Sequence, residues 1–111
     1  MMLMQVNEMG WSEVELDIVH VSFKTAYDRE IAALIEEVRQ QAVEIVEIDH
    51  MWRLHDFLSA RRHDVEGKYD NTDAGLLFVF ARLVKEKWIS VSELEGLEKS
   101  KLSKISALAR M

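Results

Sequence analysis

The sequence contains no cysteine and no proline, and only four of its 111 residues are glycine. The absence of cysteine excludes a disulfide framework and a thiolate nucleophile, and it favours an intracellular setting. Because proline and glycine are the residues that interrupt helices most strongly, long helices meet few breakers here. A chain of this length forms one hydrophobic core. We therefore expect a single all-α domain.

Basic charge and long apolar runs are also scarce. Lys and Arg number 14 against 20 Asp and Glu, which gives a net charge of −6. Nucleic-acid binding requires a positive surface, so nucleic acid is excluded as the main ligand. The opening residues 1–11 have no basic start and no long apolar stretch, so we expect neither a signal peptide nor membrane insertion. The composition predicts a cytoplasmic protein whose partners are other proteins.

The first half of the chain reads as a very long helix. Ser12 and Glu15 have the spacing of a capping box, which marks a helix start. Apolar residues then recur with helical spacing as far as Ile48, so the pattern predicts one helix over this whole stretch. Asp49 is placed to cap a second helix ending at about Val65, followed by turn residues at 67–73.

The second half reads as a group of shorter helices. A third helix is expected over about 73–87. Ser90 and Glu93 form another capping box, with Ile89 and Leu94 as its hydrophobic staple. This segment leads to a last helix that ends near Arg110. We expect a long-helix body over about 12–65 and a small helical head over about 70–111.

Apolar residues of the predicted body alternate at spacings of three and four, as in a coiled coil. The members of this seam are Ile31, Leu34, Val38, the polar Gln41, Ile45, Ile48 and Trp52. Val43 and Val46 lie off the seam, so this segment has apolar surface on a second side. The pattern predicts a homodimer in which Leu34, Val38, Ile45, Ile48 and Trp52 lie at the interface.

The predicted second helix carries two stripes when its residues are placed at 100° intervals. Met51, Leu54, Phe57, Leu58 and Val65 form a core stripe. Trp52, His55, Asp56, Ser59, Arg62 and His63 form a second band beside it. A polar band beside a core is often simply solvated. Trp and Arg, however, are enriched at the energetic centres of interfaces, which favours recognition, and the histidine and aspartate are expected to pair with Arg62 or Arg53.

Chemical interpretations of this band are weaker. His55, Asp56 and Ser59 suggest a catalytic triad, but a regular helix offers neither a strained nucleophile turn nor oxyanion donors. Metal ligation by His55 and Asp56 with His63, or with the more distant His50 and His20, matches neither the HExxH motif nor the ferritin-type ExxH motif. We expect no catalytic residue, no metal and no cofactor.

Phe78 is a second candidate, because it falls outside the apolar face of its predicted helix. Leu76, Leu77, Phe80, Leu83 and Val84 build that face. Phe78 lies instead beside Arg82 and Lys85, where it is either incidental or an anchor for a partner. The segment from Lys99 to the end carries four basic residues and no acidic residue, which suits an acidic patch on a partner.

Three stretches of the sequence resemble the cyanobacterial fluorescence recovery protein family. They are WRLHDFLSARRHDVEGKYD, LLFVFARLVKE and the closing SKISALAR, and the resemblance extends from about Trp11 over nearly the whole chain. It implies a small all-helical homodimer without a cofactor. It also implies a non-enzymatic role in photoprotection. Members bind the red, light-activated orange carotenoid protein through its C-terminal domain and speed its return to the orange form. They also promote its release from the phycobilisome at the thylakoid face.

The resemblance also implies roles for individual residues. Trp52, His55, Asp56 and Arg62 correspond to the family's functional and dimer-interface cluster, and Ile45 to a position that packs between subunits. Phe78 and Lys104, in the head, match positions that engage the carotenoid protein. Two alternatives are kept: a generic dimeric helical adaptor without this partner, and a metal-dependent helical enzyme.

Overall fold

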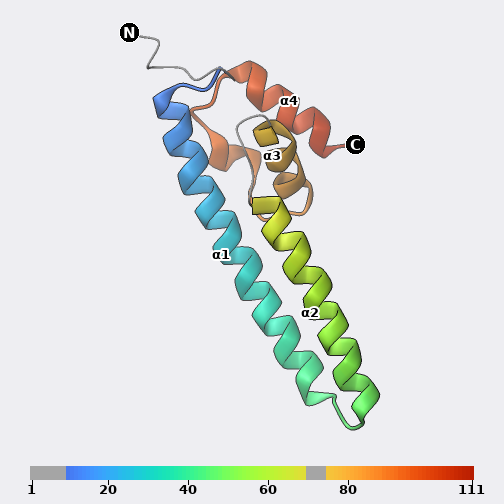
Figure 1. Ribbon diagram of the computed structural model, residues 1–111. Coiled ribbons are helices and arrows are strands. Elements are labelled where there is room, and N and C mark those ends of the chain that lie inside the picture. Colours follow the sequence, from blue (N-terminus) through green and yellow to red (C-terminus); the bar gives the residue numbers. More distant parts are fainter. Residues whose placement is uncertain (1–9, 70–74) are drawn as a thin grey trace.

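The computed structural model describes residues 10–69 and 75–111, and within these ranges every regular element is a helix. A long helical hairpin carries a compact head at one end (Figure 1). The elements, in chain order, are α1 (Glu13–Val43), α2 (Ile48–Tyr69), α3 (Leu76–Lys85), the 3₁₀ helix η3 (Val91–Leu94) and α4 (Lys99–Ala109). The molecule measures 62 × 25 × 21 Å. The predicted all-α class, with a long-helix body and a smaller helical head, is confirmed.

The predicted start of α1 is confirmed. The Ser12 hydroxyl accepts a hydrogen bond from the Glu15 backbone N–H at 3.1 Å, and the Glu15 carboxylate accepts one from the Ser12 N–H at 3.0 Å. This reciprocal pair satisfies two of the backbone donors that a helix start leaves free.

The predicted end of α1 is wrong, because the helix stops at Val43 and the chain reverses over 44–47. Val43, Ile45, Val46 and Ile48 are β-branched and so have weak helix propensity. The turn has its own hydrogen bond, from the Val46 N–H to Nδ1 of His50 at 3.2 Å. The seam is therefore broken at Ile45, which lies in the turn.

α2 also departs from the expected boundaries. It starts at Ile48 and runs to Tyr69, so Asp49 lies in its first turn and does not cap it. Gly67 lies inside the helix, where a terminating turn was predicted. α2 returns antiparallel to α1 (Figure 1), and Leu34, Val38 and Ile45 are half-buried in the single chain. The neighbouring helix that the seam requires is thus supplied in part by the chain itself.

The head is built from α3, η3 and α4. The start predicted for the third helix lies outside the described residues, and α3 ends at Lys85. The second capping box is confirmed: the Ser90 N–H donates to the Glu93 carboxylate at 2.9 Å, although the helix that it opens is a short 3₁₀ turn. Ile89 and Leu94, the predicted staple, are both buried.

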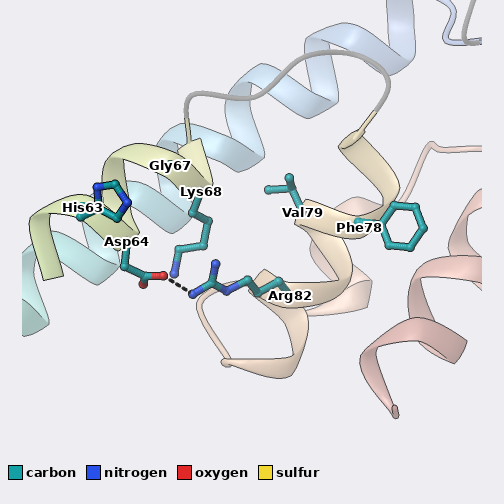
Figure 2. Close-up of a pocket in the computed structure, with 7 residues that line it drawn as sticks. All are labelled: His63, Asp64, Gly67, Lys68, Phe78, Val79 and Arg82. Carbon is teal, nitrogen blue, oxygen red and sulfur yellow. Dashed lines mark hydrogen bonds and ion pairs between the residues drawn. The ribbon is translucent and has the colours of Figure 1, made fainter. Parts of the chain in front are cut away.

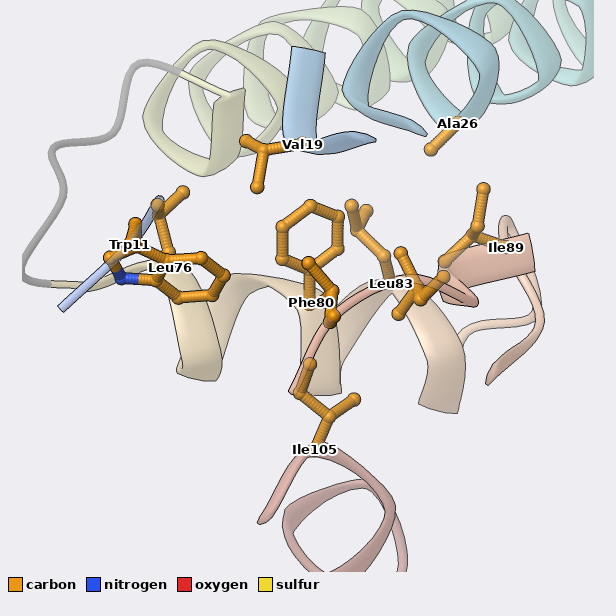
Figure 3. Close-up of a cluster of buried hydrophobic side chains, with 10 residues drawn as sticks. Trp11, Val19, Ala26, Leu76, Phe80, Leu83, Ile89 and Ile105 are labelled. Carbon is orange, nitrogen blue, oxygen red and sulfur yellow. The ribbon is translucent and has the colours of Figure 1, made fainter. Parts of the chain in front are cut away.

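The hydrophobic core lies in the head and the adjoining part of α1. Figure 3 shows α3 between α1 and α4, with Phe80 directed toward Val19 and Ile105 approaching from α4. Phe80, Leu83, Leu94 and Ile105 are completely buried. The predicted apolar face of α3 is confirmed by this packing. Trp11 joins the same core from the segment before α1.

The core stripe predicted for α2 is only partly buried. Val65 is buried, and Leu54 and Phe57 are half-buried. Met51 and Leu58 are 50% and 38% exposed, so their assignment to the core of a single chain is wrong. The reason is geometric: far from the head, α2 has only α1 to pack against, and one helix covers less than the apolar surface that α2 presents.

None of the helices in the described ranges combines the length and the apolar character needed to cross a bilayer.

Candidate functional site

Phe78 lies on the surface of the head, as the helix-face argument predicts. The residue is 66% exposed, although α3 otherwise directs its aromatic and leucine side chains into the core. In Figure 2 the ring extends from the side of α3 that is turned away from α2. Exposure of a large aromatic ring to water is unfavourable, so this position is a candidate for partner contact.

Two grooves adjoin α3 at Phe78. One, of about 380 Å³, lies between α2 and α3, where His63, Gly67 and Val79 contribute to its walls (Figure 2). The other, of about 650 Å³, lies between α3 and the end of α4, where Leu108 and Met111 line it together with Phe78. Lys104 is exposed on α4 but lines neither groove.

The predicted Trp52 band lies on the exposed surface of the hairpin. Trp52 is 58% exposed, and the side chains of His55, Asp56 and Arg62 are 73%, 82% and 80% exposed. The helix therefore presents these four residues to solvent or to a partner. The predicted dimer-interface residue Ile48 is also 58% exposed.

The pairing expected within this band is wrong. His55 and Asp56 contact each other, with Nδ1 and Oδ1 3.3 Å apart. Arg62 instead binds Glu66 at 3.1 Å, and Arg53 lies 3.6 Å from Asp49. Each arginine thus pairs with a carboxylate one helical turn away, because spacings of four residues bring side chains together on a helix.

The Trp52 end of the band lies apart from Phe78, although His63, at the other end of the band, lines a groove with Phe78. Trp52 and Asp64 are separated by twelve residues of α2, which corresponds to about 18 Å of helix. Asp64 accepts a hydrogen bond from Arg82 of α3 at 2.5 Å, so the head begins only at that level. The structure therefore places Trp52, His55, Asp56 and Arg62 on one segment of α2, with Phe78 on α3 and Lys104 on α4.

A buried ionic cluster at the junction of body and head was not predicted from the sequence. Glu30 of α1 accepts hydrogen bonds from Lys68 at 2.9 Å, from the Tyr69 hydroxyl at 3.0 Å and from Arg61 at 3.3 Å. Lys68 also donates to Glu86 at 2.7 Å. The side chains of Glu30 and Lys68 are each 1% exposed, so these hydrogen bonds replace their lost hydration.

The ionisation of this cluster follows from its contacts. Burial alone would raise the pKa of Glu86, but hydrogen bonds from Lys68 and Arg82 outweigh it and lower that pKa. The hydrogen bond from Arg82 lowers the pKa of Asp64. Burial, together with the hydrogen bond to Glu30, raises the pKa of Tyr69. The carboxylates of Glu86 and Asp64 are therefore ionised and the Tyr69 phenol is protonated at neutral pH, and the ion pair of Asp64 with Arg82 fixes α3 on α2.

A second buried pair holds α4 on the start of α1. Lys101 donates to Glu15 at 2.7 Å and to the Gly10 carbonyl at 2.6 Å, and its ammonium lies 4.5 Å from the centre of the Trp11 ring. The Glu98 backbone N–H donates to the other Glu15 oxygen at 2.9 Å. Glu15 thus both caps α1 and anchors α4.

One signal in the sequence could have located the buried acids. The buried positions of α1 recur every three or four residues, at Glu15, Val19, Ser22, Ala26 and Glu30. The two glutamates therefore begin and end a stripe that faces the core, and an acid at such a position requires a buried partner.

The described residues contain no group of three or more His, Cys, Asp or Glu side chains placed to hold a metal ion.

Comparison with known proteins places this arrangement in a family. Residues 11–109 match the family described as photoprotection regulator fluorescence recovery protein. A fluorescence recovery protein from Synechocystis sp. (strain ATCC 27184 / PCC 6803 / Kazusa) is 46% identical over 109 residues, covering 98% of this chain and 100% of the relative.

Solved structures show the same fold. The fluorescence recovery protein from Fremyella diplosiphon aligns with a TM-score of 0.87 at 50% identity, over 92% of this chain and 100% of that one. The structure from Synechocystis sp. PCC 6803 aligns with a TM-score of 0.86 at 48% identity, over 91% and 99% of the two chains. The chain therefore belongs to the fluorescence recovery protein family of photoprotection regulators.

Proposed function

We propose that this protein binds the light-activated red form of the orange carotenoid protein and accelerates its return to the orange form. By doing so it promotes release of the carotenoid protein from the phycobilisome at the cytoplasmic face of the thylakoid and restores antenna fluorescence. Membership of a family of photoprotection regulators carries this proposal. The exposed Phe78 supports it, because an aromatic side chain left out of a well-packed core suits partner binding.

The mechanism that we propose requires no covalent chemistry. A regulator accelerates a conformational change only when it binds the transition state more tightly than the starting state. Each additional 1.4 kcal/mol of such preference gives about a tenfold faster reversion. In this scheme the head holds one domain of the carotenoid protein through Phe78 and Lys104, and the rigid body favours the reunion of its two domains.

We also propose that the protein acts as a homodimer. Val46, Ile48, Met51 and Trp52 are at least 50% exposed at the end of the hairpin remote from the head. Leu58 extends the same apolar surface along α2. Covering this surface with a second copy would remove it from water, and Arg62 of the Trp52 band would lie at its edge.

The test is the absorbance change of illuminated carotenoid protein in the dark, with and without this protein. Acceleration that rises with the amount of protein supports the proposal. Equal recovery rates at excess protein would contradict it.

A further inference from the structure

Charge is distributed unequally between the two parts of the molecule. In the described body, residues 10–69, acidic residues number 13 and basic residues seven. In the described head, residues 75–111, acidic residues number four and basic residues seven. An acidic protein thus carries a head with an excess of three positive charges.

Five of the seven basic residues in the described head form no ion pair with a described residue. Arg82 and Lys101 are committed to ion pairs with Asp64, Glu86 and Glu15. The side chains of the other five, which are Lys85, Lys87, Lys99, Lys104 and Arg110, make no ion pair or hydrogen bond with any other side chain that the structure describes. Three of the four acidic residues of the head, Glu86, Glu93 and Glu98, take part in ion pairs, and Glu95 forms none with a described residue. The positive charge that remains is available to a partner.

The 650 Å³ groove between α3 and α4 brings apolar and basic side chains together. Phe78 and Met111 are 66% and 84% exposed along it, and Leu108 is half-buried. Ala81 is buried beneath them, so the floor is apolar. Arg82, Lys85 and Glu86 also line the groove. Glu86 is paired with Arg82 and Lys68, so the exposed Lys85 contributes the charge that is left unpaired there. A groove with an apolar floor and a basic wall recognises an amphipathic segment through its apolar side chains and its acidic flank.

We propose that this groove binds an acidic amphipathic segment of a partner protein, whose large apolar side chains fill the space between Phe78, Leu108 and Met111 while its carboxylates pair with Lys85. The identity of the partner rests on the proposed function. If that partner is the carotenoid protein, the groove specifies the kind of surface that the carotenoid protein must offer. It adds Lys85, Leu108 and Met111 to the binding surface.

The first experiment uses a synthetic probe and is independent of the carotenoid protein. The probe is a helical peptide with leucines four residues apart and glutamates on the adjacent face, and its control has every glutamate replaced by lysine. In methyl NMR of the full-length protein, the acidic peptide should shift the Leu108 and Met111 signals, and the effect should fall at high salt. No shift, or equal shifts with the lysine peptide, would overturn the inference.

The second experiment measures binding of illuminated carotenoid protein by variants that cannot disturb the core. Lys85→Glu and Met111→Glu change exposed side chains of the groove and should each weaken binding about tenfold. Their matched controls are Lys99→Glu, which alters the charge of the head equally at the far end of α4, and Val14→Glu, at a 67% exposed site of α1. The controls should bind as the wild type does.

The outcomes separate the two proposals. Absence of binding by the wild type would contradict the proposed function, while the peptide experiment would still decide the chemistry of the groove. Binding by the wild type that Lys85→Glu and Met111→Glu leave unchanged would overturn the groove inference alone. Loss of the dimer in these variants, measured by sedimentation, would assign the groove to a second copy of the chain and would also overturn it.

Discussion

Two kinds of residue occupy helix positions where they are unusual: charged residues that are buried, and a glycine in a helix interior. Glu30 and Lys68 are charged and buried, and each is satisfied by partners from other helices. Gly67 is flexible and lies within a helix, without a compensating contact. A pair of this kind stabilises the structure only while both partners are present, whereas the glycine lowers stability throughout.

Replacing Lys68 with methionine should destabilise the fold by about 3 kcal/mol, because the substitution leaves the carboxylate of Glu30 buried with fewer donors. The control is Lys24→Met, which breaks an exposed ion pair with Asp28 and should change stability by at most about 0.5 kcal/mol. Urea unfolding followed by circular dichroism measures both. Equal effects of the two substitutions would contradict the role assigned to the buried cluster.

Gly67→Ala should raise the free energy of unfolding by about 0.5–1 kcal/mol. Gly67 lies inside α2 and is not among the glycines with positive φ, and an added Cβ would meet nothing within 4 Å. The same urea experiment measures the change. The matched control is Gly96→Ala, where φ is +112° and the Cβ would lie 2.5 Å from Ile18, so that substitution should destabilise. A Gly67→Ala variant that is less stable than the wild type would contradict the absence of steric contacts at this position.

At the scale of elements, short polar motifs predicted where helices begin better than long apolar patterns predicted where they end. The two capping boxes could be predicted, because each depends on residues three positions apart. The reversal at 44–47 could not, since a run of β-branched residues without glycine or proline gives only a weak signal. Contacts between distant elements, such as Lys101 with Glu15, have no local signal at all.

One such contact makes the head sensitive to acid. A bidentate ion pair joins Arg29 of α1 to Glu93 of η3, and its hydrogen bonds lower the pKa of Glu93 to about 2. The folded-state pKa lies below its ordinary value near 4.5, so the stabilisation is fully present above pH 4.5 and is lost as the pH falls toward 2.

We therefore expect Glu93→Gln to reduce the dependence of stability on pH between about 4.5 and 2. Arg29→Met should reduce it by a similar amount, because it removes the main cause of the lowered pKa. Urea midpoints at pH 5 and pH 3 give the comparison. A Glu93→Gln variant with the full acid sensitivity of the wild type would contradict this assignment.

At the scale of the whole molecule, the fold and the candidate site differ in how much the sequence specifies. The helical class, the head and the exposed position of Phe78 follow from composition and helical periodicity, and the structure agrees. The grooves beside Phe78 depend on how α2, α3 and α4 pack, so periodicity within one helix could not predict them. The sequence predicts an apolar surface near Ile48, but a single chain cannot show whether a second copy covers it.

The homodimer prediction is testable at that surface. Ile48→Glu should give monomers, because a charge would be placed in an apolar interface, while the exposed side chain leaves the single chain folded. The control is Val21→Glu, at a 67% exposed site of α1 closer to the head, which should remain dimeric. Sedimentation velocity distinguishes the two states. A stable dimer of Ile48→Glu would place the interface elsewhere.

The most direct test of the central claim is the dark recovery of illuminated orange carotenoid protein, followed as the red-to-orange absorbance change with the wild type, Phe78→Asp and Val21→Asp. Phe78 and Val21 are 66% and 67% exposed, so the two substitutions disturb the fold equally little. We expect the wild type and Val21→Asp to accelerate recovery and Phe78→Asp to lose at least about tenfold of that acceleration, as expected when an aromatic anchor is removed. Recovery at the same rate with and without the wild-type protein would contradict the account.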